Sequence, residues 1–168
     1  AWGFSLFEDN AEYGLGMYLG YSAVRNEVRQ QLLQLKERLE GNDRNEKEKR
    51  LYDAICLWDH KFAEASGTRE RAENLITCLE ENIHMEGIKE ICSREDFLIK
   101  RSNWIFGGDG WAYDIGYGGL DHVLSTGADI NIMVFDTEVY SNTGGQASKA
   151  TPRAAIAKFS AAGKQRKK

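Results

Sequence analysis

Apolar residues recur at helical spacing through the middle of the chain. Steps of three and four residues put apolar side chains on one face of an α-helix, and three stripes show them: Val28, Leu32, Leu35 and Leu39; Leu51, Ile55, Trp58 and Phe62; Ala72, Leu75, Leu79 and Ile83. Turns at 41–43 and 66–68 separate the stripes, and Thr68 is the predicted N-cap of the third helix. Ser93 followed by Asp96 resembles a capping box. Residues 24–99 are therefore predicted to form charged, amphipathic helices that pack on a core.

The pattern changes to short apolar runs near residue 100. Residues 104–106 and 130–135 are typical of strands buried on both faces of a parallel sheet. A helical face lies between them, ended by Gly127 and marked by Leu120, Val123 and Leu124. This order predicts an α/β fold, with parallel strands joined by a right-handed crossover, flanking helices, a helical insertion and a further helix at the chain's end.

Composition excludes several classes of function. The chain has 168 residues, a formal charge of -4 and 42% hydrophobic residues, which suits one domain with a core and gives no sign of nucleic-acid binding. No apolar run reaches the roughly 20 residues of a membrane span. Cys56, Cys78 and Cys92 form no C-x-x-C pair, so we expect reduced thiols, a cytoplasmic setting and no metal or cluster site built from them. The basic end, 164–168, is interpreted as a solvated helix end.

A glycine-rich, polar loop follows each predicted strand. In parallel sheets, ligands bind at the carboxyl ends of strands, where Asp109 and Thr137 both stand. Mg²⁺ takes six oxygens in octahedral order, with few carboxylates and several phosphate oxygens. The Asp109 carboxylate, the Thr137 hydroxyl and the Val139 carbonyl could supply three of them, and a diphosphate and a water the rest. Close approach of a ligand is favoured by the glycines before and after Asp109, and Gly116, Gly118 and Gly119 open the next helix, whose amides could face the phosphates.

Three separated segments carry a family resemblance. Residues 107–124 and 134–152 resemble the thiamine-diphosphate domain of pyruvate:ferredoxin (flavodoxin) oxidoreductases, and 5–14 looks like a third signature of that family, in the family's order. The resemblance implies a partial thiamine-diphosphate-binding fold, with Mg²⁺ held by Asp109, Thr137 and the carbonyl of Val139. It also implies cofactor contacts from those residues together with Gly108, Gly110, Trp111, Asn142 and Thr143. Asp136-Thr137 replaces the Asn pair of the wider thiamine family, which is typical of the oxidoreductase branch.

The resemblance also implies a reaction and its partners. Members decarboxylate pyruvate oxidatively with coenzyme A to acetyl-CoA and CO₂, and reduce ferredoxin or flavodoxin through [4Fe-4S] clusters, as homodimers. The acid–base carboxylate, pyruvate recognition and cluster cysteines lie outside the matched segments, so no catalytic residue is assigned here. The chain lacks a first Met and shows two clear strands, against about five or six in a complete domain. We therefore expect a fragment of one domain (1–23, 24–99 and 100–168) that is inactive alone and associates with the parent's remaining domains.

Two other interpretations stay open on the residues alone. The chain could be a non-catalytic helical interaction module that retains the cofactor motif, with 24–99 as its functional surface. Alternatively, 134–137 resembles the strand-end nucleophile motif of haloacid-dehalogenase phosphatases. That chemistry needs a second aspartate two residues after Asp136, and Glu138 stands there.

Overall fold

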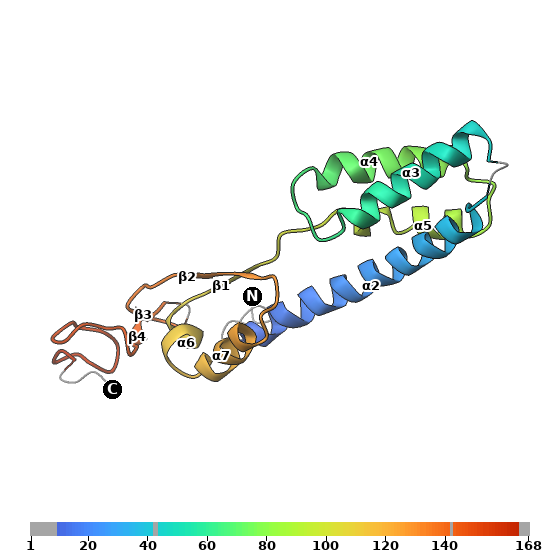
Figure 1. Ribbon diagram of the computed structural model, residues 1–168. Helices are drawn as coiled ribbons and strands as arrows, with labels where there is room; N and C mark the ends of the chain where they lie inside the picture. Colours follow the sequence, from blue (N-terminus) through green and yellow to red (C-terminus); the bar gives the residue numbers. More distant parts are fainter. Residues whose placement is uncertain (1–9, 42–43, 142, 165–168) are drawn as a thin grey trace. The chain divides into compact units, whose positions relative to one another are not determined.

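The computed structural model describes residues 10–41, 44–141 and 143–164, and the chain is mixed α/β (Figure 1). It divides into two compact units, a helical unit (20–102) and a strand unit (1–19 and 103–168). Helix α2 (Ala11–Arg38) begins in the strand unit and continues into the helical unit. The expected fragment of one domain, in parts 1–23, 24–99 and 100–168, stays a prediction. Expectations for 5–9, 42–43, 142 and 165–168 lie outside the described residues.

The helical unit is built from the predicted stripes. Besides α2 it contains α3 (Glu46–His60), α4 (Thr68–Glu81), α5 (Ile88–Cys92) and the 3₁₀ turn η1 (Glu95–Phe97). Its core includes all the predicted stripe residues except Phe62, which is partly buried against it, and Ile83. The prediction for Ile83 is wrong, with 40% of the residue exposed, because α4 ends at Glu81. The predicted capping box at Ser93 is also wrong: Ser93 follows α5, and its hydroxyl donates to the Glu90 carbonyl at 2.6 Å.

Helix starts are set by local polar contacts that differ from those predicted. A reciprocal capping box, which the sequence reading missed, starts α3: the Asn45 side chain accepts from Glu48 N–H, and the Glu48 carboxylate accepts from Asn45 N–H, each at 3.0 Å. Thr68 is not an N-cap, because Gly67 takes that position in a left-handed conformation (φ 65°). The Thr68 hydroxyl instead accepts the Lys100 N–H at 2.8 Å.

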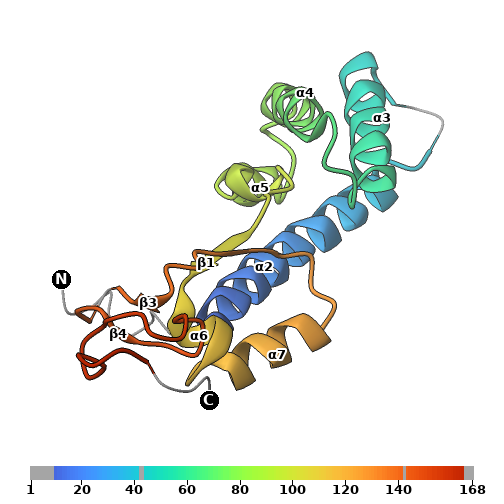
Figure 2. The same ribbon diagram turned by 90° about the vertical axis from the view of Figure 1, so that its left-hand side faces the viewer.

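The strand unit contains the predicted parallel pair. Strands β1 (Trp104–Gly107) and β2 (Asn131–Val134) run parallel, with Ile105 opposite Ile132 (Figures 1 and 2). The segment between them forms α6 (Asp109–Tyr113) and α7 (Tyr117–Ser125). A short antiparallel hairpin, β3 (Val139–Tyr140) and β4 (Gln146–Ala147), follows β2. The chain therefore brings the ends of β1 and β2 together at one edge of the sheet.

One face of this two-stranded sheet carries the core of the strand unit. The buried residues come from α2, β1, α6 and α7: Ala11, Leu15, Ile105, Trp111, Ala112, Leu120 and Val123. Gly14 allows α2 to approach β1 closely, because a Cβ there would lie 2.6 Å from the Ile105 side chain. Leu124, predicted to share the face of α7, is 62% exposed. One helical step turns the side chain by about 100° away from Val123.

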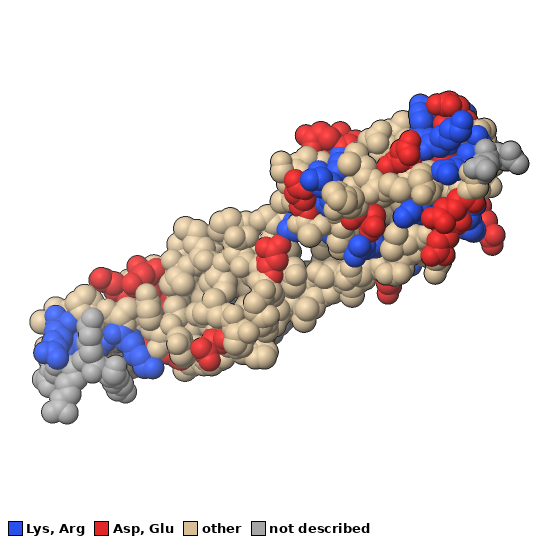
Figure 3. Space-filling view, viewed as in Figure 1, with Lys and Arg blue, Asp and Glu red and all other residues tan. Residues whose placement is uncertain are grey.

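The opposite face of the sheet is exposed. Trp104 (54% exposed), Phe106 (57%) and Met133 (44%) lie on it, so the prediction of strands buried on both faces is wrong for the described residues. The cause is that the described helices of this unit cover only the face of Ile105 and Ile132. Trp104 stacks on Phe106, with ring centroids 6.0 Å apart. Lys, Arg, Asp and Glu are scattered densely over the helical unit, and few mark the visible face of the strand unit near β1 and β2 (Figure 3).

The chain's last described segment departs from the predicted helix. Residues 151–164 form turns and isolated bridges, such as Gln146 with Lys158. A helical stretch shorter than about 12–15 residues is marginal without tertiary packing, which explains the difference. The Lys164 amine donates to the backbone carbonyls of Ser148 and Lys149. No helix in the described part of the chain has the length and apolar character needed to cross a bilayer.

We expect the isolated chain to self-associate through this exposed sheet face, because large apolar patches and unpaired strand edges favour association. Trp104→Thr combined with Met133→Thr keeps β-propensity and removes apolar area. Sedimentation velocity should show oligomers for the unaltered chain and a smaller weight-average mass for the double variant. Ile115→Ser, an 80% exposed position outside the strands, serves as the control. A monodisperse, cooperatively melting monomer of the unaltered chain would contradict the expectation.

Candidate functional site

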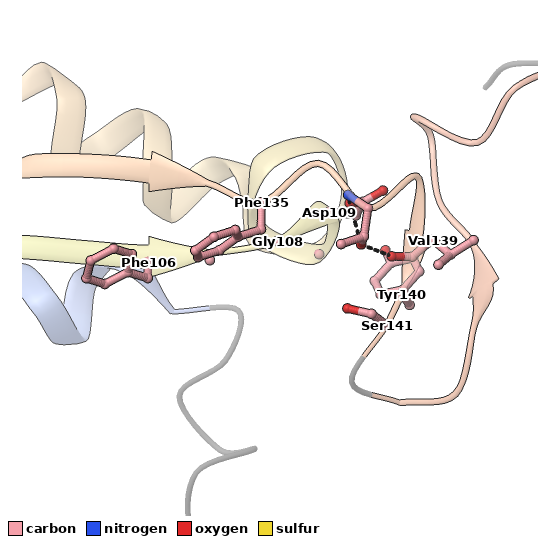
Figure 4. A pocket seen from close by; sticks show the side chains of 10 residues that line it. Phe106, Gly108, Asp109, Phe135, Val139, Tyr140 and Ser141 are labelled. Carbon is pink, nitrogen blue, oxygen red and sulfur yellow. Dashed lines mark hydrogen bonds between the residues drawn. The ribbon is translucent and has the colours of Figure 1, made fainter.

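A cavity of about 410 Å³ opens where β1 and β2 end (Figure 4). The lining comes from the end of β1, the start of α6 and the segment after β2: Phe106, Gly107, Gly108, Asp109, Gly110, Phe135, Thr137, Val139, Tyr140 and Ser141. The structure therefore brings together five of the predicted site residues, namely Gly108, Asp109, Gly110, Thr137 and Val139.

Glycine at position 107 is required by the packing below this cavity. A Cβ on Gly107 would lie 1.3 Å from Trp111 Nε1, so the buried indole or the strand would have to shift. Gly108 continues in extended conformation, and Asp109 is the first residue of α6, only 2% exposed. Trp111, a predicted cofactor contact, is 1% exposed and belongs to the core, and it is not among the residues that line the cavity.

Thr137 Oγ1 lies close to two other oxygen atoms of residues that line the cavity. Asp109 Oδ1 accepts the Thr137 N–H at 3.0 Å and lies 3.2 Å from Thr137 Oγ1. The same Oγ1 lies 2.9 Å from the carbonyl oxygen of Val139 (Figure 4). Glu138, between the two loop residues, has φ 61°, a left-handed conformation uncommon outside glycine. This bend lets the Thr137 hydroxyl meet the carbonyl two residues later.

These spacings fit a magnesium ion. With Mg–O bonds of about 2.0–2.1 Å and octahedral order, neighbouring ligand oxygens are separated by about 2.9 Å. The distances of Thr137 Oγ1 to its two oxygen neighbours, 2.9 and 3.2 Å, are close to this value. Among the described residues, no group of three or more His, Cys, Asp or Glu side chains could hold a metal. Of the three candidate ligand residues, Asp109 is charged, whereas Thr137 and Val139 offer neutral oxygens. One charged ligand suits a cation whose remaining ligands are phosphates and water.

A second layer of hydroxyls, which sequence reasoning missed, surrounds Asp109. The Ser148 hydroxyl donates to Asp109 Oδ2 at 2.5 Å. The Thr151 hydroxyl accepts the Ser148 N–H at 2.8 Å and donates to the Glu138 carbonyl. Ser148 and Thr151 are 4% and 1% exposed. Their spacing suits a local turn, but nothing in the sequence links that turn to an aspartate 39 residues earlier.

Other predicted residues lie away from the cavity or outside the described part. Thr143 is exposed, and its hydroxyl donates to the Gln146 side chain at 2.7 Å. Asn142 is not described. The Tyr113 hydroxyl donates to Asp136 Oδ2 at 3.0 Å, and this hydrogen bond is the main cause that raises the pKa of Tyr113. Asp136, the nucleophile of the phosphatase interpretation, is therefore engaged with a tyrosine and does not line the cavity.

The start of α7, whose amides were expected to face the phosphates, is not part of the described cavity lining. Gly116, Gly118 and Gly119 are absent from the described cavity lining. Instead the Glu12 carboxylate lies beside Gly119, where a Cβ would come within 2.2 Å of its oxygens. Lys149 Nζ lies 3.8 Å from Asp114 Oδ1. Among the described residues that line the cavity, Asp109 is the charged one.

Comparison with known proteins places the whole chain within longer relatives. No protein-family model matches it. It is 53% identical over 171 residues to the pyruvate-flavodoxin oxidoreductase of Klebsiella pneumoniae and 43% identical over 182 residues to the pyruvate:ferredoxin oxidoreductase of Moorella thermoacetica; each match covers 100% of this chain and 14% of the relative. A third relative, the pyruvate dehydrogenase [NADP(+)] of Cryptosporidium parvum, is 44% identical over 197 residues, covering 100% of this chain and 10% of the relative. The chain spans about a seventh of the length of the Klebsiella pneumoniae and Moorella thermoacetica relatives. It belongs to the family of pyruvate:ferredoxin and pyruvate-flavodoxin oxidoreductases.

Proposed function

We propose that the chain supplies the magnesium–thiamine-diphosphate-binding part of an enzyme that oxidatively decarboxylates pyruvate with coenzyme A. The products are acetyl-CoA and CO₂, and ferredoxin or flavodoxin takes up the electrons. The observation that carries the proposal is the pair of spacings from Thr137 Oγ1 beside the cavity, 3.2 Å to Asp109 Oδ1 and 2.9 Å to the Val139 carbonyl oxygen. Homologues named for pyruvate oxidation support the reaction class.

The residues of this chain have separate roles in the proposal. Asp109 contributes the ligand charge, while Thr137 and Val139 contribute neutral oxygens. Gly108 and Gly110 keep side chains away from the approach to Asp109. The bound thiamine diphosphate would supply the carbanion-stabilising chemistry of decarboxylation, and the protein supplies placement and electrostatics.

Apolar side chains line the same cavity. Phe106, Phe135 and Tyr140 form part of its wall, and the rings of Phe106 and Phe135 are stacked with centroids 6.1 Å apart. A ligand bound against these half-exposed rings would displace water from them, which would strengthen the electrostatic interactions made on its other side. The cavity thus offers a charged end at Asp109 and an apolar end at the two phenylalanines.

The remaining functions are assigned to other parts of the parent protein. In the described residues, Cys56, Cys78 and Cys92 are free cysteines of the helical unit and are not grouped with other metal-binding side chains. Burial raises the pKa of both the Cys78 and the Cys92 thiol. We therefore propose that the [4Fe-4S] clusters, coenzyme A and pyruvate are bound by further domains, in a homodimeric parent.

A segment exchange tests the proposal. In the exchange enzyme, this chain replaces the matching segment of the Klebsiella pneumoniae relative, to which it is 53% identical. We expect pyruvate- and CoA-dependent flavodoxin reduction within about tenfold of the parent's rate. EDTA should abolish it and Mg²⁺ restore it, because the proposed site needs the cation. A folded exchange enzyme that binds no Mg²⁺–thiamine diphosphate would contradict the proposal and favour a non-catalytic helical module.

A further inference from the structure

The two oxygens of the Asp109 carboxylate have different neighbours. Oδ1 lies beside Thr137, where the proposed cation site is. Oδ2 accepts the hydroxyl of Ser148 at 2.5 Å, a contact between two buried residues. A carboxylate fixed in this way presents one oxygen to the cavity and keeps the other turned into the protein.

The proton of the Ser148 hydroxyl is committed to Asp109 by the surrounding hydrogen bonds. The Ala150 N–H donates to Ser148 Oγ at 3.1 Å, which occupies an acceptor position of the hydroxyl. The Thr151 hydroxyl lies 3.4 Å from Ser148 Oγ, but its own proton goes to the Glu138 carbonyl. Since a hydroxyl has a single proton to give, Ser148 donates it to Asp109 Oδ2.

Thr151 ties this arrangement to the loop that carries the other two oxygens. It accepts the Ser148 N–H and donates to the carbonyl of Glu138, the left-handed residue between Thr137 and Val139. The Ser148–Thr151 turn therefore braces both sides of the proposed cation site, the carboxylate through Ser148 and the bent loop through Thr151.

The number of oxygens that Asp109 can offer bears on which cation is bound. Mg²⁺ takes six oxygens at about 2.0–2.1 Å in near-ideal octahedral order, whereas Ca²⁺ takes about 6–8 at 2.3–2.6 Å and often binds carboxylates through both oxygens. We infer that Ser148 is a positioning residue that holds Asp109 to one-oxygen coordination and thereby favours Mg²⁺ over Ca²⁺. This inference rests on the proposed function, because it concerns the same cation.

Cation selectivity separates this role from plain structural support. The exchange enzyme, stripped of cations and saturated with thiamine diphosphate, is titrated with Mg²⁺ and with Ca²⁺ by calorimetry. For Ser148→Ala we expect the Mg²⁺ dissociation constant to rise about 10-fold, the lower end of typical outer-shell effects. The Ca²⁺ constant should change less than about threefold, because a released carboxylate can bind Ca²⁺ through both oxygens. Ser148→Thr, which keeps the hydroxyl, should restore much of the selectivity.

Matched variants keep the test decisive. Thr151→Val removes the second hydroxyl at similar volume and should lower Mg²⁺ selectivity, whereas Thr151→Ser should retain it. Ser125→Ala removes an exposed hydroxyl that donates to the His122 carbonyl and should leave both constants unchanged. If folded Ser148→Ala and Thr151→Val keep the unaltered ratio of Mg²⁺ to Ca²⁺ dissociation constants, the inference about Ser148 is overturned and the proposed function is not affected. Loss of cation-dependent binding in the unaltered exchange enzyme, or normal binding by its Asp109→Ala variant, would instead overturn the proposed function.

Discussion

Asp109→Ala is expected to lower the pyruvate-dependent activity of the exchange enzyme by more than about 100-fold. Removing a partner that only orients a metal ligand typically costs about 10- to 100-fold, and Asp109 is proposed as a ligand itself. It is also the charged residue among the described cavity lining. The substitution therefore removes the protein's negative charge at the cation. Steady-state kinetics with added Mg²⁺ and thiamine diphosphate measure the loss.

Two further variants show whether the loss comes from the cation site. Asp121→Ala removes an exposed carboxylate of α7 and should leave activity within about twofold, as expected for a surface change. Asp109→Asn keeps the side chain's size but removes its charge, so it should also lose activity while retaining the fold. Raising Mg²⁺ to millimolar concentrations should recover part of the lost activity if affinity is the main defect. Full activity of Asp109→Ala at low Mg²⁺ would rule out the assigned ligand.

Gly107→Ala is expected to destabilise the strand unit by an amount at or above the roughly 1–3 kcal/mol typical of overpacked cores. The new Cβ would lie 1.3 Å from Nε1 and 1.6 Å from Cε2 of Trp111. Trp111 is 1% exposed and packed in the core, so either its ring or the end of β1 has to move. A shift of the strand end displaces Asp109, which follows Gly107 by two residues. Thermal melting of the exchange enzyme should show one transition whose midpoint temperature rises when Mg²⁺ and thiamine diphosphate are added. In Gly107→Ala, the midpoint temperature of this transition should fall, or the transition should disappear.

A double-mutant cycle separates this steric conflict from a general effect of alanine. Trp111→Leu opens space beside position 107, so Gly107→Ala should cost at least about 1 kcal/mol less in that background. Gly16→Ala is the matched control, because a Cβ there meets nothing within 4 Å and alanine favours an exposed helix by about 0.5–1 kcal/mol. Equal effects of Gly107→Ala in both backgrounds would show that Trp111 is not the obstacle.

The meeting of Asp109 and Thr137 could be predicted from sequence because the ends of parallel strands obey a simple rule. The sequence identified β1 and β2 as apolar runs, and parallel pairing then required Asp109 and Thr137 to share one edge of the sheet. Their 3.2 Å separation follows from that register and from the bend at Glu138. The helical core was predictable for a similar reason, since its periodic stripes depend on local geometry alone.

What could not be predicted depends on contacts distant in sequence. Ser148 reaches Asp109 across 39 residues, and no local pattern reports that contact. The family resemblance implies Trp111 as a cofactor contact, but its ring is buried in the core, where the absence of a side chain at Gly107 makes room for it. Thr68 suited an N-cap by residue type, but Gly67 takes that position and the Thr68 hydroxyl accepts the Lys100 N–H. Residue type thus indicates what a side chain can do, and tertiary contacts decide which option is used.

Crystals of the exchange enzyme with Mn²⁺ and thiamine diphosphate would locate the cation relative to Asp109 and Thr137. Mn²⁺ substitutes for Mg²⁺ at oxygen sites and can be located by its anomalous scattering. The account predicts one peak within coordination distance of Asp109 Oδ1, Thr137 Oγ1 and the Val139 carbonyl, at about 2.1 Å for Mg²⁺ and slightly longer for Mn²⁺. A peak elsewhere, with Thr137 Oγ1 still hydrogen-bonded to Asp109 Oδ1 and the Val139 carbonyl, would contradict the proposal.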